Sequence, residues 1–204
     1  MRIAILSVVV IAVVAILGGV FWMNQSQPQV ELSPAMLNVE GADIGGPFEL
    51  VTQDGERVTS DALIDGPTLI YFGYTFCPDV CPLDLQKMAH AVDVLEERGV
   101  EIKPVFITID PERDTVEELA GWADSVHPDL VALTGSPEEI KAAADAYKVY
   151  YQKAHVEGSA AGYLMDHTAF FYLMTPERGI TAMFRHEATA EDLATDIERV
   201  VRAL

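Results

Sequence analysis

The stretch Thr75-Phe76-Cys77-Pro78-Asp79-Val80-Cys81-Pro82 contains the only two cysteines of this 204-residue chain. An apolar run over residues 68–74, typical of a buried strand, precedes it, and a helical pattern over residues 80–98 follows it. The cysteines are four positions apart, so on a helix their Cβ atoms would lie on one face, roughly 5–6 Å apart. Two thiolates at that separation can hold a soft metal ion or close a disulfide. The stretch therefore predicts a metal site, a redox site or both.

Charge and cysteine content exclude several classes of protein. The chain carries 13 basic and 32 acidic residues, a formal charge of −19, which is unfavourable for binding the phosphates of nucleic acid. Two cysteines are too few for a disulfide-stapled secreted scaffold. A chain of this length buries a sizeable core without such staples.

The N-terminal segment predicts the compartment. Residues 3–23 carry no charge and are long enough to cross a hydrocarbon core of about 30 Å. Trp22 stands at the end of this segment, where interfacial aromatics are common, and Arg2 favours a cytoplasmic start. We expect an uncleaved single-pass anchor in a bacterial inner membrane, with the globular part on the periplasmic side. A cleaved signal peptide is the alternative, but no clear small-residue cleavage site follows.

Three regions are expected along the chain. Residues 1–23 form the anchor with a short cytoplasmic start, residues 24–46 form a polar tether, and residues 47–204 form the folded domain. The domain begins with a hairpin over 48–59 that turns at Asp54-Gly55. Strands are then expected at 68–74, 102–110, 130–134, 149–155, 168–174 and 180–186, and helices at 80–98, 115–126, 136–147 and 191–204.

This order indicates an α/β fold, a thioredoxin-like sandwich with a central mixed β-sheet flanked by helices and an added N-terminal hairpin. The strand at 68–74, the cysteine turn and the helix at 80–98 form the unit in which such a fold presents reactive cysteines. The helix is expected to bury a stripe of Leu83, Met88, Val92 and Leu95.

One histidine is placed to complete a site with the cysteines. His167 directly precedes the apolar strand at 168–174, which we expect beside the strand at 68–74, so its loop can reach the cysteine turn. The other four histidines are expected at a solvent-facing helix position, a helix end and two strand ends: His90, His127, His155 and His186. A lone His167 would more often be a capping or core residue; the nearby cysteine pair favours a metal ligand.

Two thiolates and one imidazole suit a soft metal, and copper is the predicted ion, as Cu(I) with Cu(II) as a second state. Structural zinc normally recruits a fourth protein ligand, and none stands out. The cysteine turn lies at a helix N-terminus, which favours the thiolate form. Disulfide exchange uses the same ionised sulfur, so a redox role stays open. A purely structural disulfide is the weakest alternative, because so short a loop removes little chain entropy.

Several carboxylates near these motifs have weaker roles. Asp166 could orient His167, and Asp79 could face a partner or simply favour the helix dipole. Asp110 and Asp114 resemble hard-metal ligands, but a strand-end turn stabilised by Arg113 is the better interpretation.

Three motifs together make the chain similar to the Sco/SenC family. They are the cysteine stretch from Gly73 to Pro82, the sequence DPERDT at 110–115, and Asp166-His167-Thr168 followed by an apolar strand that ends in Met174-Thr-Pro176. The resemblance covers about residues 40–200 and also extends to the anchor. It implies a membrane-anchored, thioredoxin-fold copper protein that assembles the binuclear CuA centre of cytochrome c oxidase. It also implies that Cys77, Cys81 and His167 bind the copper.

Two details belong to this resemblance. Many family members have histidine where this chain has Phe76, but that position is not a ligand in the family. The family fold also has an inserted hairpin before the ligand histidine, for which residues 149–162 are the candidate.

Four functions are in competition. The first is a copper metallochaperone, and the second is a thiol–disulfide oxidoreductase that reduces the acceptor's cysteines. The third is a peroxidase of peroxiredoxin type, which would use Thr75 near one nucleophilic cysteine, and the fourth is a structural module. The first implies three protein partners: the oxidase subunit with the CuA site, a copper-loading factor, and a thiol reductase that keeps Cys77 and Cys81 reduced.

Overall fold

The computed structural model describes residues 33–37, 39, 41–155 and 162–204, and in these residues the central element is a mixed β-sheet. The predicted anchor at 3–23 lies outside the described residues. Within the described ranges, no helix is both long enough and apolar enough to cross a membrane.

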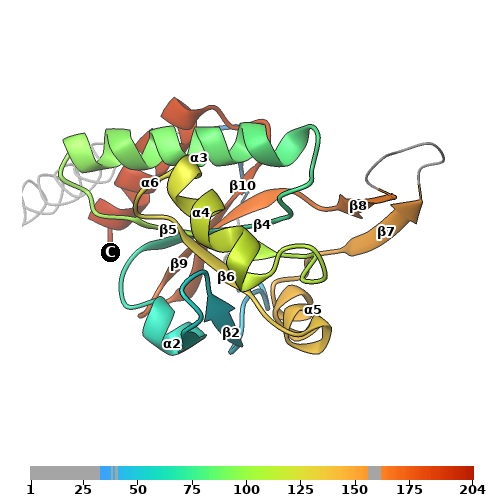
Figure 1. The fold of residues 1–204 in the computed structure, drawn as a ribbon. Coiled ribbons are helices and arrows are strands. Elements are labelled where there is room, and N and C mark those ends of the chain that lie inside the picture. The colour runs from blue at the N-terminus through green and yellow to red at the C-terminus, as the bar shows by residue number, and fades with distance from the viewer. Residues whose placement is uncertain (1–32, 38, 40, 156–161) are drawn as a thin grey trace, which may run out of the picture. The chain divides into compact units, whose positions relative to one another are not determined.

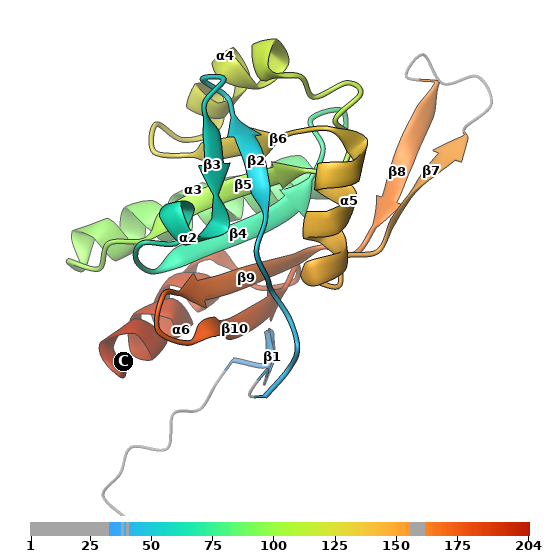
Figure 2. The same cartoon turned by 90° about the horizontal axis from the view of Figure 1, so that it is seen from below.

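The sheet has eight strands in the order β1-β10-β9-β4-β5-β6-β2-β3 (Figures 1 and 2). Its parallel centre is β4 (Thr68–Gly73), β5 (Lys103–Thr108) and β6 (Val131–Thr134). Antiparallel strands extend both sides: β9 (Phe170–Thr175) and β10 (Gly179–Arg185) beyond β4, and the hairpin β2 (Glu49–Thr52) and β3 (Arg57–Thr59) beyond β6. The mixed sheet and the N-terminal hairpin are as predicted.

Helices cover the two faces of this sheet. Helix α3 (Val80–Glu97) lies beside α6 (Ala190–Arg202) on one face, and α5 (Pro137–Ala146) lies on the other (Figure 2). The remaining helices are α2 (Ser60–Leu63) and α4 (Val116–Val126). The predicted thioredoxin-like sandwich is therefore confirmed.

Three features differ from the sequence-based expectations. Leu83 was expected in the buried stripe of α3 but is 54% exposed, because the buried face starts at Cys81 and continues through Leu85 and Met88. Within the segment expected to be a tether, β1 (Met36–Leu37) pairs with β10. The third difference is that residues expected to be a loop before His167 form a strand.

That strand belongs to a separate two-stranded sheet. β7 (Tyr151–His155) pairs antiparallel with β8 (Tyr163–His167), so His167 is the last residue of the hairpin. The expected hairpin at 149–162 was therefore placed too early, since its second strand lies at 163–167. The segment begins with three apolar residues, Tyr163-Leu164-Met165, but it is too short and too weakly patterned to predict a strand.

β4 positions the cysteine turn. All six of its residues are buried, and its last residue, Gly73, is followed directly by the turn. A Cβ added at Gly73 would lie 2.8 Å from Tyr71 Cε1, 3.1 Å from Cys81 Sγ and 3.2 Å from Phe106 Cε2. Only glycine therefore allows the Cys81 sulfur to pack this closely against the strand.

Replacing Gly73 by alanine should accordingly lower the free energy of unfolding by about 1–3 kcal/mol, the usual cost of overpacking a core. Denaturant unfolding measures this change. Gly121→Ala is the matched control, because its Cβ would meet nothing within 4 Å in α4 and alanine is the better helix former. Equal stability of Gly73→Ala and wild type would contradict the packing argument.

Candidate cysteine–histidine metal and redox site

The two thiols lie on either side of the start of α3. Cys77 is half-buried in the loop after β4, and Cys81 is 1% exposed in the first turn of α3. Both cysteines are free. The N-cap residue Asp79 makes no side-chain capping bond; instead, the backbone N–H of Cys81 donates to Cys77 Sγ at 3.5 Å. The Cys77 sulfur therefore lies where the helix dipole favours negative charge.

His167 reaches the same place from the β7–β8 hairpin. Its Nε2 lies 3.4 Å from Cys81 Sγ, and its Nδ1 lies 3.1 Å from the carbonyl oxygen of Thr168. A carbonyl oxygen only accepts, so Nδ1 carries a proton and Nε2 is the ring nitrogen that faces the sulfur. The tautomer with its proton on Nδ1 is the one required for a metal ligand bound through Nε2.

Aromatic side chains surround the imidazole. The rings of Tyr71 and Tyr74 meet it edge to face, at centroid distances of 6.5 and 6.1 Å. The Tyr71 hydroxyl donates to Asp84 Oδ2 at 3.1 Å, and the Asp84 carboxylate, 1% exposed, pairs with Lys87 at 3.0 Å. Burial raises the pKa of Tyr71, so its hydroxyl stays protonated. The sequence analysis overlooked Asp84; its only signal was an acid on the buried face of a helix.

The two thiols have opposite acidities. A hydrogen bond from Cys81 lowers the pKa of Cys77 well below its usual range, and His167 and backbone N–H groups near Asp79 and Cys81 lower it further. The same hydrogen bond, together with burial, raises the pKa of Cys81. One proton is therefore held on Cys81 while Cys77 is the thiolate.

This difference predicts selective alkylation. In the reduced full-length chain, iodoacetamide should modify Cys77 at least about tenfold faster than Cys81, because only Cys77 is both accessible and ionised. Peptide mass spectrometry over time measures both rates. Lowering the pH from 8 to 6 should change the Cys77 rate little, since its folded-state pKa lies below this window. Equal rates for the two cysteines, or a Cys77 rate that falls tenfold per pH unit, would contradict this assignment.

The turn at 110–114 holds the cysteine loop in place. Asp114, with a fully buried side chain, accepts from the Thr75 backbone N–H at 3.0 Å, from Thr75 Oγ1 at 2.5 Å and from Thr108 Oγ1 at 2.6 Å. Asp110 pairs with Arg113. These carboxylates are therefore structural, as expected. The Thr75 hydroxyl, considered for a peroxidase, donates to Asp114 instead.

The other predicted site residues lie farther out. Asp79 and Asp166 are exposed, and the Thr168 carbonyl occupies the position beside Nδ1 that Asp166 was considered for. A role for either carboxylate stays a prediction. His90, His155 and His186 are also exposed. His127 ends α4 and lies 3.2 Å from Asp93.

The three candidate ligands form a hydrogen-bonded set that is not yet a closed metal cage. In the parts of the chain that the structure describes, no group of three or more His, Cys, Asp or Glu side chains is spaced to hold a metal ion as it stands. Binding therefore requires loss of the Cys81 proton and a small shift of the side chains. Their chemistry fits a soft metal, because two sulfurs and one imidazole nitrogen are the donors.

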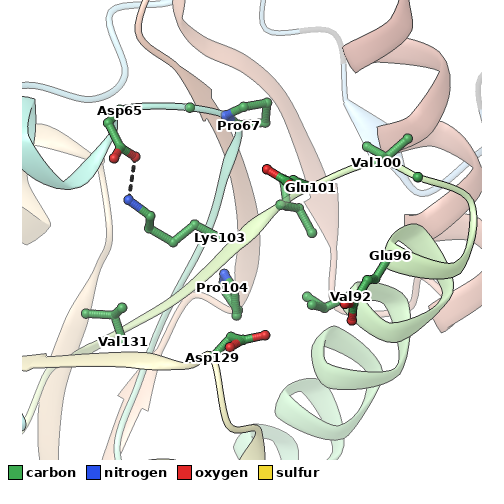
Figure 3. A pocket seen from close by; sticks show the side chains of 13 residues that line it. Asp65, Pro67, Val92, Glu96, Val100, Glu101, Lys103, Pro104, Asp129 and Val131 are labelled. Atoms are coloured by element: carbon green, nitrogen blue, oxygen red, sulfur yellow. Dashed lines mark hydrogen bonds and ion pairs between the residues drawn. The ribbon is translucent and has the colours of Figure 1, made fainter.

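A pocket of about 590 Å³ lies at the opposite end of β4 from the cysteines (Figure 3). Its lining includes the apolar side chains of Pro67, Val92 and Pro104 and the acidic side chains of Glu96, Glu101 and Asp129. Its one lysine, Lys103, is paired with Asp65. No cysteine or histidine lines it, so it is not part of the site.

The fold and the site define a class of protein: a thioredoxin-like domain whose cysteine pair and one histidine meet at the end of the central strand. The chain matches the SCO1/SenC family model over residues 38–202 and belongs to that family. The family resemblance of the sequence motifs is thereby confirmed.

Individual relatives support this assignment. The chain is 45% identical over 162 residues to the mitochondrial SCO1 homolog 1 of Arabidopsis thaliana. The match covers 79% of this chain and 48% of that protein. It therefore spans about half the length of that relative. The chain is also 43% identical over 163 residues to SenC of Rhodobacter capsulatus. This match covers 80% of the chain and 73% of SenC.

Solved structures agree. The crystal structure of Arabidopsis thaliana ScoI with copper bound is 44% identical, covers 79% of this chain and 99% of that one, and superposes with a TM-score of 0.76. BsSco, described as a member of the Sco family of cytochrome c oxidase assembly proteins, is 22% identical with a TM-score of 0.62, covers 80% of this chain and 96% of that one, and supports the fold alone. Copper, the metal predicted from the sequence, is thus bound by a relative of the same fold.

Proposed function

We propose that this chain is a copper metallochaperone that binds copper through Cys77, Cys81 and His167 and delivers it to the CuA site of cytochrome c oxidase. The contact of His167 Nε2 with Cys81 Sγ at 3.4 Å carries this proposal, because a simple dithiol reductase has no need of an imidazole there. The copper-bound relative supports the choice of metal.

The exposure of the ligands suits transfer as well as binding. Cys81 is buried and His167 is partly buried, so they retain the ion, whereas Cys77 is reachable from solvent. Two sulfurs and one nitrogen leave Cu(I) three-coordinate, so an acceptor thiolate can join before a donor leaves. Copper then passes by ligand exchange, with Cys77 as the first donor to let go.

The proposed setting follows from the chain outside the described residues. The uncharged segment 3–23 would anchor the protein in the bacterial inner membrane, with the stretch between it and β1 as tether and the folded domain on the periplasmic side. In that oxidising compartment the thiols require a partner reductase. A copper-loading factor and the oxidase subunit with the CuA site complete the proposed partners.

Competition for Cu(I) tests the metal site. The reduced full-length chain is titrated against a chelator of known affinity, alongside His167→Ala and, as a control, His90→Ala, which changes an exposed histidine on α3. We expect one tightly held equivalent, an affinity at least about tenfold lower in His167→Ala, and no change in His90→Ala. If wild type binds no more tightly than a generic dithiol, the proposal fails.

A thiol–disulfide oxidoreductase is the second candidate, and the opposed acidities of the two free cysteines favour it. A reachable thiolate backed by a buried thiol is the arrangement for forming and resolving a mixed disulfide. The reduction potential of the pair and its rate of exchange with an oxidised dithiol peptide decide this role. If exchange is fast and equal in wild type and His167→Ala while copper is bound weakly, the reductase becomes the main function.

A further inference from the structure

The turn at 110–114 touches both halves of the candidate site, which come from distant parts of the chain. Through Asp114 it holds Thr75, two residues before Cys77. Through Arg113 it reaches the β7–β8 hairpin, which ends in His167. The turn thus contacts both the loop that carries Cys77 and the hairpin that carries His167, so it can set the distance between them.

The guanidinium of Arg113 packs among aromatic rings from both halves. Its Cζ lies 3.9 Å from the ring centroid of Tyr163, at the start of β8, and 4.9 Å from that of Phe76, the residue before Cys77. The ring of Tyr74 follows at 5.7 Å. The Arg113 side chain is only 16% exposed, so the guanidinium is largely shielded from water, although the Phe76 ring is 49% exposed.

Hydrogen bonds fix the plane of that guanidinium. Nε donates to the Asp110 carboxylate, and Nη1 donates to the Tyr163 carbonyl oxygen at 3.1 Å. The Tyr163 hydroxyl donates to Asp110 Oδ1 at 2.8 Å. Asp110, Arg113 and Tyr163 therefore form a closed set of contacts that allows the arginine little freedom.

The hairpin depends on such contacts for its position. β7 and β8 form a two-stranded sheet that is not hydrogen-bonded into the main sheet, and an isolated hairpin is only marginally stable. At its base, Thr168 N–H donates to the Tyr150 carbonyl, and Met165 is buried. Arg113 adds a link directly to the cysteine loop.

We propose that Arg113 is a positioning residue that sets the separation between His167 and the cysteine pair by stacking between Phe76 and Tyr163. Lysine cannot replace it, because only a planar guanidinium offers two faces and a directed set of donors at once. This inference rests on the proposed copper site.

The test compares Arg113→Lys with wild type in the full-length chain. Arg57→Lys is the control, because Arg57 is likewise an arginine paired with carboxylates, Glu49 and Glu139, but lies on the hairpin β2–β3. We expect Arg113→Lys to remain folded by far-UV circular dichroism and to lose about 10–100-fold in Cu(I) affinity, the usual range for a residue that orients a ligand. In the Cu(II) form, its EPR spectrum should shift towards that of His167→Ala.

A double variant separates positioning from a general structural effect. If Arg113 acts through His167, Arg113→Lys should cost little further affinity on the His167→Ala background. A metal-free measurement supports the same point: the imidazole resonances of His167 in the apo protein should move in Arg113→Lys and stay in Arg57→Lys.

The outcomes are distinguishable. If wild type binds no copper tightly, the proposed function fails, whatever Arg113 does. If wild type binds copper and Arg113→Lys leaves affinity, EPR spectrum and His167 resonances unchanged, the positioning role is wrong. An equal loss of affinity with and without His167 would also overturn it, because Arg113 would then act on the fold or on the cysteines alone.

Discussion

Replacing Cys81, a proposed ligand, by serine should abolish tight copper binding. We expect Cu(I) affinity to fall by more than about a hundredfold, because losing a ligand costs more than the 10–100-fold loss typical of disturbing the residues around it. A hydroxyl is a hard donor and does not replace a thiolate on Cu(I). The buried position also prevents another donor from taking its place, because Cys81 is 1% exposed and packs against Gly73. Chelator competition on the reduced full-length chain measures the change.

Met88→Leu is the control for this experiment. It removes a sulfur atom from the same face of α3, where Met88 is also 1% exposed, and it conserves volume. We expect wild-type copper affinity and a stability change below about 1.5 kcal/mol. Wild-type affinity in Cys81→Ser would show that the buried sulfur is not a ligand and that the proposed site of two sulfurs and one imidazole is wrong.

Replacing Asp114 by asparagine should lower the free energy of unfolding by about 1–3 kcal/mol at neutral pH, the cost of leaving a buried polar group unsatisfied. The carboxylate accepts three hydrogen bonds from Thr75 and Thr108. Asparagine has only one acceptor oxygen, and its amide group would face a donor. Copper affinity should fall too, because Thr75 anchors the loop that carries Cys77.

The pH dependence of this effect has a defined sign. Burial raises the pKa of Asp114 in the folded state. The folded state therefore binds the Asp114 proton more tightly than the unfolded state does. The resulting contribution of Asp114 to the free energy of unfolding is complete below the unfolded pKa of about 3.9 and decreases as the pH rises through the higher folded-state pKa. The stability difference between wild type and Asp114→Asn should thus shrink with rising pH across that window.

Denaturant unfolding at several pH values measures this trend. The control is Asp124→Asn, an identical change on the exposed side of α4, expected to stay within about 0.5 kcal/mol of wild type. An Asp114→Asn variant as stable as wild type at every pH would show that these hydrogen bonds contribute nothing to the turn.

Much of the fold could be predicted because its signals are local. The mainly apolar run at 68–73 forms β4, and Gly99, with φ of 71°, follows helix α3. Ser136 and Thr189 cap α5 and α6 through their side chains. The order of these elements was sufficient to indicate the thioredoxin-like sheet and to place His167 near the cysteines.

Other features depend on contacts that no local pattern reveals. The buried face of α3 excludes Leu83 because tertiary packing, not the apolar spacing alone, selects the face. The β8 strand is short and half-polar, so only its pairing with β7 defines it. The acidities of Cys77 and Cys81 differ because one sulfur is buried and donates to the other.

By itself, the sequence determined the class of fold, the thiol pair at the end of the central strand and the position of His167 beside that pair. These follow from residue type and periodicity, which act over a few neighbouring positions. The tertiary structure alone decided how the site is held: the Thr168 carbonyl beside Nδ1, Asp114 under Thr75, and Arg113 between Phe76 and Tyr163. Hydrogen bonds and ring contacts act over a few ångströms in space and join residues that are far apart in the sequence. No local sequence pattern therefore predicts them.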